Sequence, residues 1–472
     1  MWNIHQAYID GAFVAVHGDE VVDMIAPTTE QRIGRVTLGN REDAKLAIAA
    51  ARRTQPMMAA TTKAQRIDML RRLQAAVLAR TEELRDVTIE EYGGPWARAQ
   101  WVSRYASECF ANAAQVLEAY PLSHPVGTAT VTMQPVGVAA LVAPWNSAVG
   151  TVCCKLASAL SAGCATVVKP SEMSPLQTQV LAQALHEAGL PPGVFNILLG
   201  RGADVGDEIS TSPDIAKISF TGSTATGKTI VRAAVETMKR VSLSLSGKSA
   251  SIVLDDADLD AAVSQAIAAA FMNNGQACVA GTRLLVPRSR AGEIVERVKA
   301  GVTALRVGDP RDPDTAVGPL ASRAQFERVR GFIRRGLDEG ATLVAGGESR
   351  PQGLERGFFV QPTVFADVRN DMDIARQEIF GPVLSVIAYE DEAQAIAIAN
   401  DSVYGLQAYV FSSQPERAQR VAAQLEAGTV LINRVQPELL APFGGVKQSG
   451  IGREFGVAGL ESFLEAKAVA GA

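Results

Sequence analysis

The sequence has 472 residues, of which 47% are apolar and 20% are charged, and its formal net charge at pH 7 is −5. A chain of this length is too long for one ordinary core and predicts a compact enzyme of roughly two or three domains. The composition argues against disorder, no apolar run reaches the ~20 residues of a bilayer span, and the scattered Lys and Arg residues argue against a nucleic-acid surface.

The chain contains five cysteines and four histidines. The cysteines are Cys109, Cys153, Cys154, Cys164 and Cys278. Because they lack metal-ligand spacing and a chain of this size needs no disulfides, we expect reduced thiols and no metal site. No histidine lies near a nucleophile motif, which argues against a Ser-His or Cys-His pair. The first residues show no basic start followed by an apolar core, so we expect a cytoplasmic protein.

A helical layer is predicted from Arg41 to Ala119. Apolar residues recur there at helical spacing, as in Ile67, Leu70 and Leu73. The following segment, residues 120–127, breaks this pattern with two prolines and a glycine. Residues 128–134 then alternate like a strand, which predicts a projecting β arm.

Short apolar runs then alternate with helical segments between Val136 and Val253. The runs are residues 138–142, 165–168, 196–199 and 217–220. Continuous apolar runs of this length are typical of buried parallel strands, so the pattern predicts a doubly wound α/β domain. A second alternation from Ala250 to Gly428 predicts a second domain, and we expect Cys278 to open onto a cleft between the two.

The segment around Cys278 carries the clearest chemical signal. It reads Phe-Met-Asn-Asn-Gly-Gln-Ala-Cys-Val-Ala-Gly-Thr-Arg over residues 271–283. A buried packing cysteine is the commoner fate of a free thiol, but this polar, glycine-containing approach can place backbone dipoles beside the sulfur and lower its pKa. The segment resembles the nucleophile segment of the NAD(P)-dependent aldehyde dehydrogenase superfamily, in which a thiolate attacks an aldehyde. The resemblance makes Cys278 that thiolate.

The resemblance runs from about Ala26 to the last residues and implies a complete architecture. It implies an α/β, aldehyde dehydrogenase-like fold of two doubly wound domains with a cleft between them and a small β oligomerisation arm. The NAD-binding domain would comprise residues 1–121 and 139–245, the catalytic domain residues 246–450, and the arm residues 122–138 and 451–472. Arms of this kind carry oligomer contacts in the family, which implies a homodimer or homotetramer.

One position departs from the family pattern. Most members carry a water-activating glutamate in a segment of the type L-E-L-G-G-K-S, whereas this chain reads Leu-Ser-Leu-Ser-Gly-Lys-Ser from Leu243 to Ser249, with Ser244 at the glutamate position. A serine does not titrate near neutral pH and cannot act as the same base. The chain keeps the predicted nucleophile and lacks the usual base.

Asn146 is the predicted oxyanion donor. Pro144, Trp145 and Asn146 match the family's P-W-N, although a strand-ending turn is the simpler explanation of such a tripeptide in isolation. The match implies that the Asn146 amide and the backbone N–H of Cys278 stabilise the oxyanion, and that Trp145 lies on the cofactor side.

Further matches predict the cofactor site. Lys169 and Glu172 lie in a K-P-S-E segment that meets the adenosine ribose in the family, and Glu172 favours NAD because its carboxylate would repel a 2′-phosphate. NADP remains the alternative cofactor. Glu378 and Phe380, in E-I-F-G-P-V, are expected beside the nicotinamide ribose and ring. Gly222 and Ser223, in F-T-G-S-T, are expected to approach the pyrophosphate at a helix start.

The same segment offers a rival function. Residues 222–229 satisfy G-x-x-x-x-G-K-T and follow a predicted strand, as the phosphate loop of a nucleoside triphosphatase does. An acidic strand end at Asp255 follows later in the chain. A P-loop nucleoside triphosphatase that uses Gly222 to Thr229 is therefore the alternative to an aldehyde dehydrogenase, from a different class of enzyme.

The substrate is predicted to be a small-molecule aldehyde. The family's tunnel positions correspond to Ser147, Cys154 and Phe443, and the small side chains at Ser147 and Cys154 predict a wide tunnel for bulky or aromatic aldehydes. The expected reaction is NAD(P)-dependent oxidation of the aldehyde to the acid through a Cys278 thioester.

Ser244 leaves the fate of that thioester open. The acyl group passes to coenzyme A, or another carboxylate activates water, or deacylation is impaired.

Overall fold

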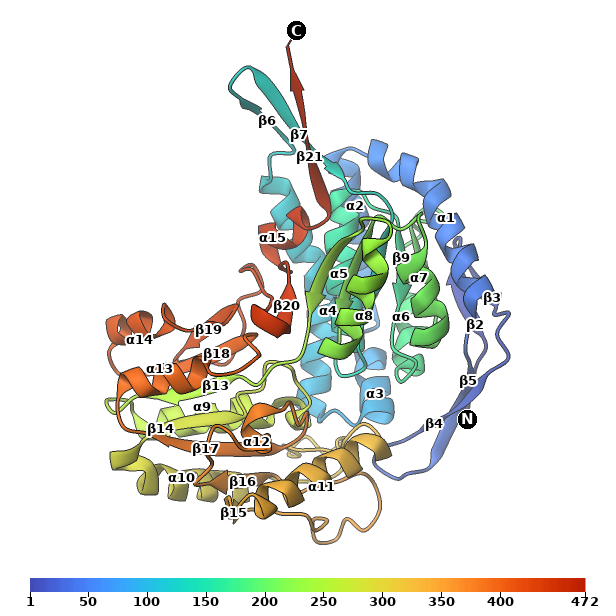
Figure 1. The fold of residues 1–472 in the computed structure, drawn as a ribbon. Coiled ribbons are helices and arrows are strands. Elements are labelled where there is room, and N and C mark those ends of the chain that lie inside the picture. Colours follow the sequence, from blue (N-terminus) through green and yellow to red (C-terminus); the bar gives the residue numbers. More distant parts are fainter. Residues whose placement is uncertain (472) are drawn as a thin grey trace.

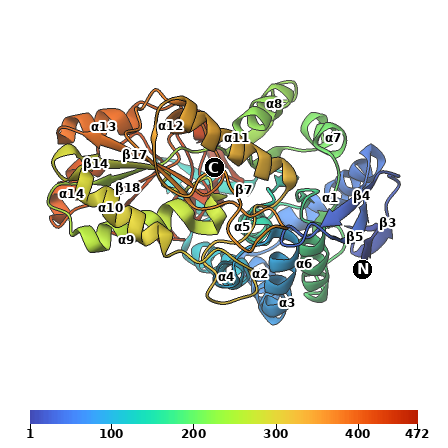
Figure 2. The same ribbon diagram turned by 90° about the horizontal axis from the view of Figure 1, so that it is seen from below.

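The computed structural model describes residues 1–471 and shows two α/β halves side by side, with a β arm that projects from the first half and carries the C-terminus (Figure 1). The view from below shows the same separation of the two halves (Figure 2). Within residues 1–471, no helix combines the length and the apolar character needed to cross a membrane.

The first half is built on an eight-stranded sheet with the strand order β20-β12-β11-β8-β9-β10-β2-β3. The central strands β12, β11, β8, β9 and β10 are parallel, whereas β20, β2 and β3 are added antiparallel at the edges. The parallel strands are Ala139–Val142 (β8), Thr166–Lys169 (β9), Phe195–Ile197 (β10), Lys217–Thr221 (β11) and Arg240–Ser244 (β12). Four of these strands, all except β12, were predicted from the sequence and are confirmed within one or two residues. The edge strands Gln6–Ile9 (β2), Ala12–Ala15 (β3) and Gly450–Ile451 (β20) were not predicted.

The predicted helical layer from Arg41 to Ala119 consists of four helices. They are Arg41–Ala60 (α1), Lys63–Ala79 (α2), Thr81–Tyr92 (α3) and Trp96–Ala119 (α4). Capping boxes define two of the starts, because Asn40 and Asp43 close the first turn of α1 and Thr62 and Gln65 close that of α2. The crossover helices are Ala148–Ala162 (α5), Pro175–Glu187 (α6), Asp207–Thr211 (α7) and Thr224–Val235 (α8).

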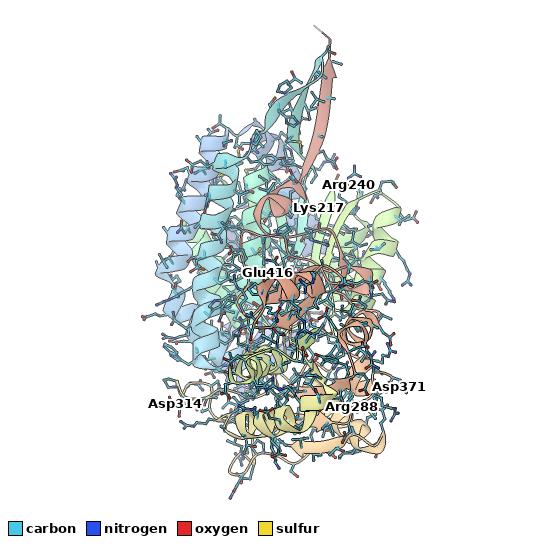
Figure 3. All side chains as sticks on the ribbon, turned by 90° about the vertical axis from the view of Figure 1, so that its left-hand side faces the viewer. Lys217, Arg240, Arg288, Asp314, Asp371 and Glu416 are labelled. Atoms are coloured by element: carbon cyan, nitrogen blue, oxygen red, sulfur yellow. The ribbon has the colours of Figure 1, made fainter. Side chains whose placement is uncertain are left out.

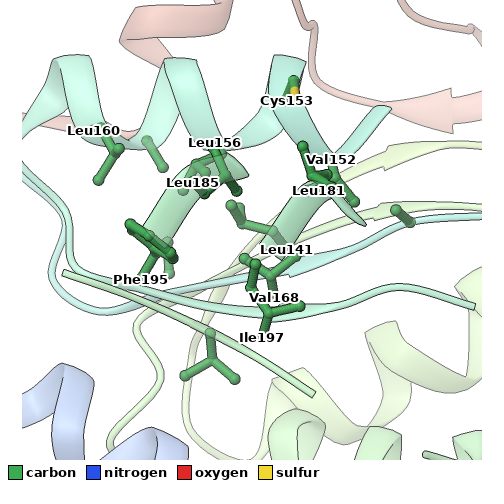
Figure 4. Close-up of a cluster of buried hydrophobic side chains, with 14 of the residues drawn as sticks. Leu141, Val152, Cys153, Leu156, Leu160, Val168, Leu181, Leu185, Phe195 and Ile197 are labelled. Atoms are coloured by element: carbon green, nitrogen blue, oxygen red, sulfur yellow. The ribbon is translucent and has the colours of Figure 1, made fainter. Parts of the chain in front are cut away.

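These helices cover both faces of the first sheet, which is the doubly wound arrangement. Helices α5 and α6 contact each other and are backed by α2, α3 and α4, whereas α7 contacts α1 and α8 on the opposite face (Figure 2). Figure 4 shows the core under α5, where leucines from α5 and α6 meet Leu141, Val168 and Ile197 from the strands. Cys153 lies within this apolar cluster, and burial raises the pKa of its thiol, so Cys153 is a packing residue of this core.

The second half is built on a seven-stranded sheet with the order β15-β16-β17-β14-β13-β18-β19. All neighbours are parallel except β15 and β16. The strands are Ala250–Val253 (β13), Arg283–Pro287 (β14), Thr342–Ala345 (β15), Thr363–Ala366 (β16), Val383–Tyr389 (β17), Gln407–Phe411 (β18) and Thr429–Ile432 (β19).

Alternate residues of this second sheet enter two separate cores, as the two-residue period of a strand requires. Ile252 and Leu285 belong to one core, and Val253 and Leu284 belong to the other. The helices on the two faces are Leu259–Phe271 (α9) and Ala291–Thr303 (α10) on one side, and Arg323–Asp338 (α11), Asp373–Arg376 (α12), Glu392–Asn400 (α13) and Pro415–Ala422 (α14) on the other. This half is therefore also doubly wound.

The arm is a three-stranded antiparallel sheet with the order β21-β7-β6. Its strands are Ser123–Val126 (β6), Ala129–Pro135 (β7) and Leu464–Ala470 (β21), and α15 (Gly456–Glu461) precedes β21. Figure 3 shows Lys217 and Arg240 near the base of the arm and Arg288, Asp314 and Asp371 towards the opposite end of the molecule. A further small sheet joins Trp2–Ile4 (β1), Val21–Ile25 (β4) and Arg32–Thr37 (β5) near the N-terminus.

Candidate active site

A cleft of about 420 Å³ lies where the carboxyl ends of the first sheet face the amino ends of the second sheet. Strands β8, β11 and β12 end at this cleft, and strands β13, β14 and β17 begin beyond it. Ligands bind in open α/β sheets outside the carboxyl ends of the strands, so this location is typical of an active site. Eight of the predicted site residues line it: Trp145, Asn146, Gly222, Ser223, Ser244, Cys278, Glu378 and Phe380.

The loop before Cys278 has a strained backbone that its sequence accommodates. Asn273, Asn274 and Gly275 have positive φ angles of 54°, 60° and 70°, a left-handed region that Asn and Gly adopt most readily. A Cβ on Gly275 would lie 2.2 Å from the carbonyl carbon of Gly381, so only glycine fits this approach. The Asn274 amide donates to the carbonyl oxygens of Gly93 and Pro319 over 3.1 and 3.0 Å. These contacts fix the loop that presents the sulfur.

Asn146 is held against this loop. Its Nδ2 donates to the carbonyl oxygen of Gln276 over 2.8 Å, and Asn273 donates to the Asn146 carbonyl oxygen over 2.9 Å. A side-chain amide has two N–H donors, so one remains for a ligand. The predicted oxyanion donor therefore lies beside the predicted nucleophile, on the same cleft.

The Cys278 thiol is protonated at neutral pH in this state of the protein. Burial is the largest effect and the negative charge of Glu378 adds to it, so that the pKa of Cys278 is raised to about 12. The backbone N–H groups of Cys278 and Val279 lower the pKa, as the sequence predicted, but their effect is smaller. Deprotonation of the Cys278 thiol therefore needs either a less negative surrounding charge or a proton acceptor.

Glu378 and Phe380 are positioned by contacts from both halves. The Glu378 carboxylate accepts a hydrogen bond from the backbone N–H of Gly247 over 3.0 Å, and burial raises the pKa of Glu378. Arg328 donates to the Glu378 carbonyl oxygen over 2.6 Å. The Phe380 ring meets the Trp145 ring edge to face, with centroids 5.3 Å apart. Trp145 and Phe380 thus form an aromatic wall of the cleft.

The segment Gly222 to Thr229 is not a phosphate loop, so the P-loop prediction is wrong. Helix α8 begins at Thr224, directly after the Ser223 N-cap, and Gly227, Lys228 and Thr229 lie inside the helix. Lys228 is exposed and donates to the Gln448 side chain over 3.0 Å. The sequence pattern of a P-loop is present, but its structure is not, because no loop of the required length precedes the helix.

The start of α8 nevertheless suits an anion. Gly222, Ser223, Thr224 and Ala225 all line the cleft, and the Ser223 hydroxyl accepts from the backbone N–H of Thr226 over 3.2 Å. The first N–H groups of a helix lack intrahelical acceptors and carry the positive end of its dipole. This end of the cleft fits a pyrophosphate group.

Lys169 and Glu172 lie at the carboxyl end of β9 as a pair. Their side chains are 3.7 Å apart, and the buried Lys169 ammonium has one other acceptor, the Pro170 carbonyl oxygen at 3.4 Å. Arg201 lies 3.4 Å from the Glu172 carboxylate and was missed in the sequence. Donors of Lys169 and acceptors of Glu172 remain available to ribose hydroxyls.

Ser244 is buried at the end of β12 and lines the cleft with Cys278. Its hydroxyl has no hydrogen-bond partner among residues 1–471, and the same is true of the Thr221 hydroxyl on the neighbouring strand. Two orphaned hydroxyls beside the predicted nucleophile mark a polar site that a ligand or water completes. Neither hydroxyl supplies a carboxylate.

A carboxylate that the sequence analysis missed lies close by. Glu454 accepts hydrogen bonds from Lys155 and from the Ser219 hydroxyl, the latter over 3.3 Å, and its negative charge contributes to the raised pKa of Cys278. Lys155 also donates to Ser219 over 2.8 Å. Glu454 could have been noticed in the sequence as a charged residue at the end of a short run with two glycines. This run, Gly450-Ile451-Gly452-Arg453-Glu454, follows the segment that contains Phe443.

The predicted tunnel residues do not line this cleft. Cys154 lines a separate cavity of about 30 Å³ together with Tyr105 and Phe455, and the Phe443 ring stacks on Phe455 with centroids 5.3 Å apart. Ser147 is the residue before α5, where the ring of Tyr105 lies against Gly150. An aromatic ring from α4 therefore adjoins the small residues on α5.

Comparisons with known proteins show the family of the chain. The sequence model described as the aldehyde dehydrogenase family matches residues 13–469. The chain is 44% identical to a 3-succinoylsemialdehyde-pyridine dehydrogenase from Pseudomonas sp, with 100% of this chain and 99% of that protein covered. Among solved structures, a mutant of aldehyde dehydrogenase C from Pseudomonas syringae with NAD+ and octanal is 42% identical, with a TM-score of 0.97 over 99% of this chain and 96% of that one. A betaine aldehyde dehydrogenase from Staphylococcus aureus with NAD+ is 35% identical, with a TM-score of 0.95 over 98% and 94% of the two chains.

Proposed function

Because the chain belongs to the aldehyde dehydrogenase family and is an NAD-dependent enzyme of aldehyde oxidation, we propose that Cys278 is its nucleophile and Asn146 its oxyanion donor. The observation that carries the proposal is their placement on one cleft, with the Asn146 amide 2.8 Å from the Gln276 carbonyl oxygen, two residues before Cys278. Neither the nucleophile nor the oxyanion donor acts as a metal ligand in this proposal.

The first half of the reaction follows from these residues. Once the Cys278 thiol has released its proton to solvent, the thiolate attacks the aldehyde carbon, and the new oxyanion accepts from the free N–H of Asn146 and the backbone N–H of Cys278. Bound NAD would supply the hydride acceptor for oxidation of the thiohemiacetal to the thioester. The start of α8, the Lys169–Glu172 pair and the Trp145–Phe380 wall are the parts of the chain that would hold it.

The second half of the reaction is the altered step. Water must attack the Cys278 thioester, and a positioned general base is typically worth ~10² to 10⁴ in rate. Ser244 offers a buried hydroxyl in place of that base. We therefore expect slow hydrolysis. The charges of two carboxylates act on Cys278: Glu378, which accepts from the Gly247 N–H, and Glu454, which accepts from Lys155 and Ser219.

A single assay tests both halves. The enzyme with NAD and an aldehyde is expected to form about one equivalent of NADH per site in a rapid burst and then turn over slowly. Intact mass should show a thioester that is lost in Cys278→Ala. Ser244→Glu should speed the slow phase by up to ~10² to 10⁴ with little change in the burst, whereas the isosteric control Ser244→Gln should not.

Two results would overturn this account. A burst that survives Cys278→Ala would exclude the nucleophile. Fast steady turnover of the unchanged enzyme, with no gain in Ser244→Glu, would show that Ser244 does not limit hydrolysis. Rapid turnover only with coenzyme A, giving acyl-CoA, would support the alternative of acyl transfer over hydrolysis.

The arm supports a proposal about assembly. The side chains of β6 are exposed, and Val126 and Val469 expose 55% and 58% of their surface on this small projecting sheet. Exposed apolar residues beside unpaired strand edges suit contact with another chain. We expect a homodimer or homotetramer through β6, β7 and β21, and light scattering of a Val126→Asp, Val469→Asp variant tests this.

A further inference from the structure

Arg98 is a cation without a partner. It lies in the first turn of α4, and its guanidinium carbon is 4.5 Å from the centre of the Trp101 ring. Its Nε is buried and has no hydrogen-bond partner, and no carboxylate pairs with Arg98 among residues 1–471. Arg85, on the preceding helix, behaves differently because it is paired with Asp86 and Gln100.

The buried, unpaired Nε–H of Arg98 is costly for the folded protein. A buried donor without an acceptor destabilises the folded state, and more so when the donor is charged. A guanidinium also presents its N–H donors in a planar fork that matches a carboxylate, and it stays charged at every physiological pH. Such a group is explained if a ligand supplies the missing acceptor.

Arg98 lies within electrostatic reach of the nucleophile. Burial lowers the pKa of Arg98, and a negative charge on Tyr92, Tyr105 or Cys278 would raise it. The Tyr92 hydroxyl accepts from Gln276 over 3.1 Å and donates to the Asn273 carbonyl oxygen over 3.3 Å. Tyr105, on the same helix as Arg98, lies against Gly150, one turn after Asn146, so this helix adjoins the residues that follow the predicted oxyanion donor.

An aromatic row extends from Arg98 towards the C-terminal loop. Trp101 stacks on Tyr105 with centroids 5.0 Å apart, Tyr105 meets Phe455 at 6.4 Å, and Phe455 stacks on Phe443 at 5.3 Å. Trp101 is 38% exposed, so the row begins at the surface. Apolar surface beside a cation suits a ligand with a hydrocarbon or aromatic body and an anionic end.

We propose that Arg98 binds a carboxylate at the end of the substrate remote from the aldehyde, so that the enzyme acts on carboxylate-bearing aldehydes. The inference rests on the proposed function, since it names a substrate class for the same Cys278 site. Arg98 is a specificity residue in this proposal and takes no part in bond making.

The test compares pairs of aldehydes of similar shape, one with a carboxylate and one without. The probes are para-carboxybenzaldehyde against its methyl ester, and adipic semialdehyde against hexanal, with the burst of NADH measured in single turnovers. The enzyme should prefer the carboxylate member of each pair. Arg98→Met should reduce the apparent second-order burst rate for the carboxylate members by about 10- to 100-fold, the loss expected for a charge-assisted hydrogen bond, and far less for the neutral members.

Two further variants separate recognition from a structural effect. Arg98→Lys keeps the charge but loses the planar fork, so it should restore part of the preference. Arg85→Met removes a paired arginine from the neighbouring helix and should leave the preference unchanged. The affinity for NAD should be the same in all variants.

The proposal and the proposed function can fail separately. Equal rates for charged and neutral aldehydes, or an equal loss for both in Arg98→Met, would overturn the role of Arg98 while leaving Cys278 chemistry intact. If no aldehyde gave a burst, the proposed function would fail. Quenching of Trp fluorescence by terephthalate, present in the unchanged enzyme and absent in Arg98→Met, would still support the carboxylate site, and its absence from the unchanged enzyme would reject it.

Discussion

The side-chain amide of Asn146 and the backbone carbonyl of Gln276 are joined by a 2.8 Å hydrogen bond across the two halves of the molecule. Asn146 follows β8 of the first sheet, and Gln276 belongs to the loop before β14 of the second. The bond uses one N–H of the amide and directs the other away from Gln276. The geometry of the predicted oxyanion site therefore depends on how the two halves pack.

Replacing Asn146 tests that donor. Asn146→Ala is expected to slow the NADH burst by about 10² to 10³, the usual cost of losing one oxyanion donor. Asn146→Asp keeps the shape of the side chain and removes its donors, so it should be at least as slow. NAD titration is the control, and a burst of normal rate in either variant would contradict the assignment.

Removing the charge of Glu378 should make Cys278 more acidic. The negative carboxylate disfavours a second negative charge on the sulfur and raises the pKa of Cys278, so Glu378→Gln is expected to lower that pKa from about 12. Alkylation by iodoacetamide over a range of pH reports the thiolate, with Cys278→Ala as the blank. A midpoint that stays or rises in Glu378→Gln would refute this electrostatic account.

Glu454→Gln tests the remaining carboxylate. If Glu454 activates water for residual hydrolysis, the variant should prolong the life of the Cys278 thioester by about 10- to 100-fold, less than a well-placed base contributes. The burst amplitude should stay near one equivalent. Thioester decay followed by intact mass measures this, and Glu461→Gln, at the end of α15, is a control carboxylate. Unchanged decay in Glu454→Gln would assign Glu454 to the positioning of Lys155 instead.

Glu172 should set the preference for NAD over NADP. Its carboxylate would repel a 2′-phosphate, and it also occupies Arg201, which lies 3.4 Å away. Glu172→Gln removes the repulsion, while Arg201 stays paired with Glu20 over 2.7 Å, so binding of NADP relative to NAD should improve by about 10- to 100-fold. Fluorescence titration of both cofactors is the measurement. A variant that still excluded NADP would place the selectivity elsewhere.

Gly275 should tolerate no side chain. In Gly275→Ala the new Cβ would meet the backbone of Gly381 and would also sit at a φ of 70°, so we expect a loss of about 3 to 5 kcal/mol in the free energy of unfolding. Gly340 has a φ of 85° but open space around it, so Gly340→Ala should cost only about 1 to 2 kcal/mol. Thermal unfolding compares the two, and equal losses would mean that the contact with Gly381 is relieved by local movement.

The sequence by itself determined the family, the periodic elements and the chemical identity of the nucleophile segment. Helices α1 to α4 and strands β8 to β11 were predictable because helical and strand periodicities are local properties of the chain. The edge strands β2, β3 and β20 were not, because an edge strand is defined by pairing with residues far along the sequence. The P-loop motif failed for a related reason, since a letter pattern does not say where a helix begins.

Only the tertiary structure decided the electrostatics and contacts of the site. The sequence suggested a Cys278 thiol made acidic by nearby dipoles, whereas burial and the charge of Glu378 together raise its pKa. Arg98, Arg201 and Glu454 carried little signal in the sequence because their roles depend on which groups lie opposite them in space. Desolvation and charge pairing arise when distant segments pack together, so the sequence could name the reacting groups but not their environment.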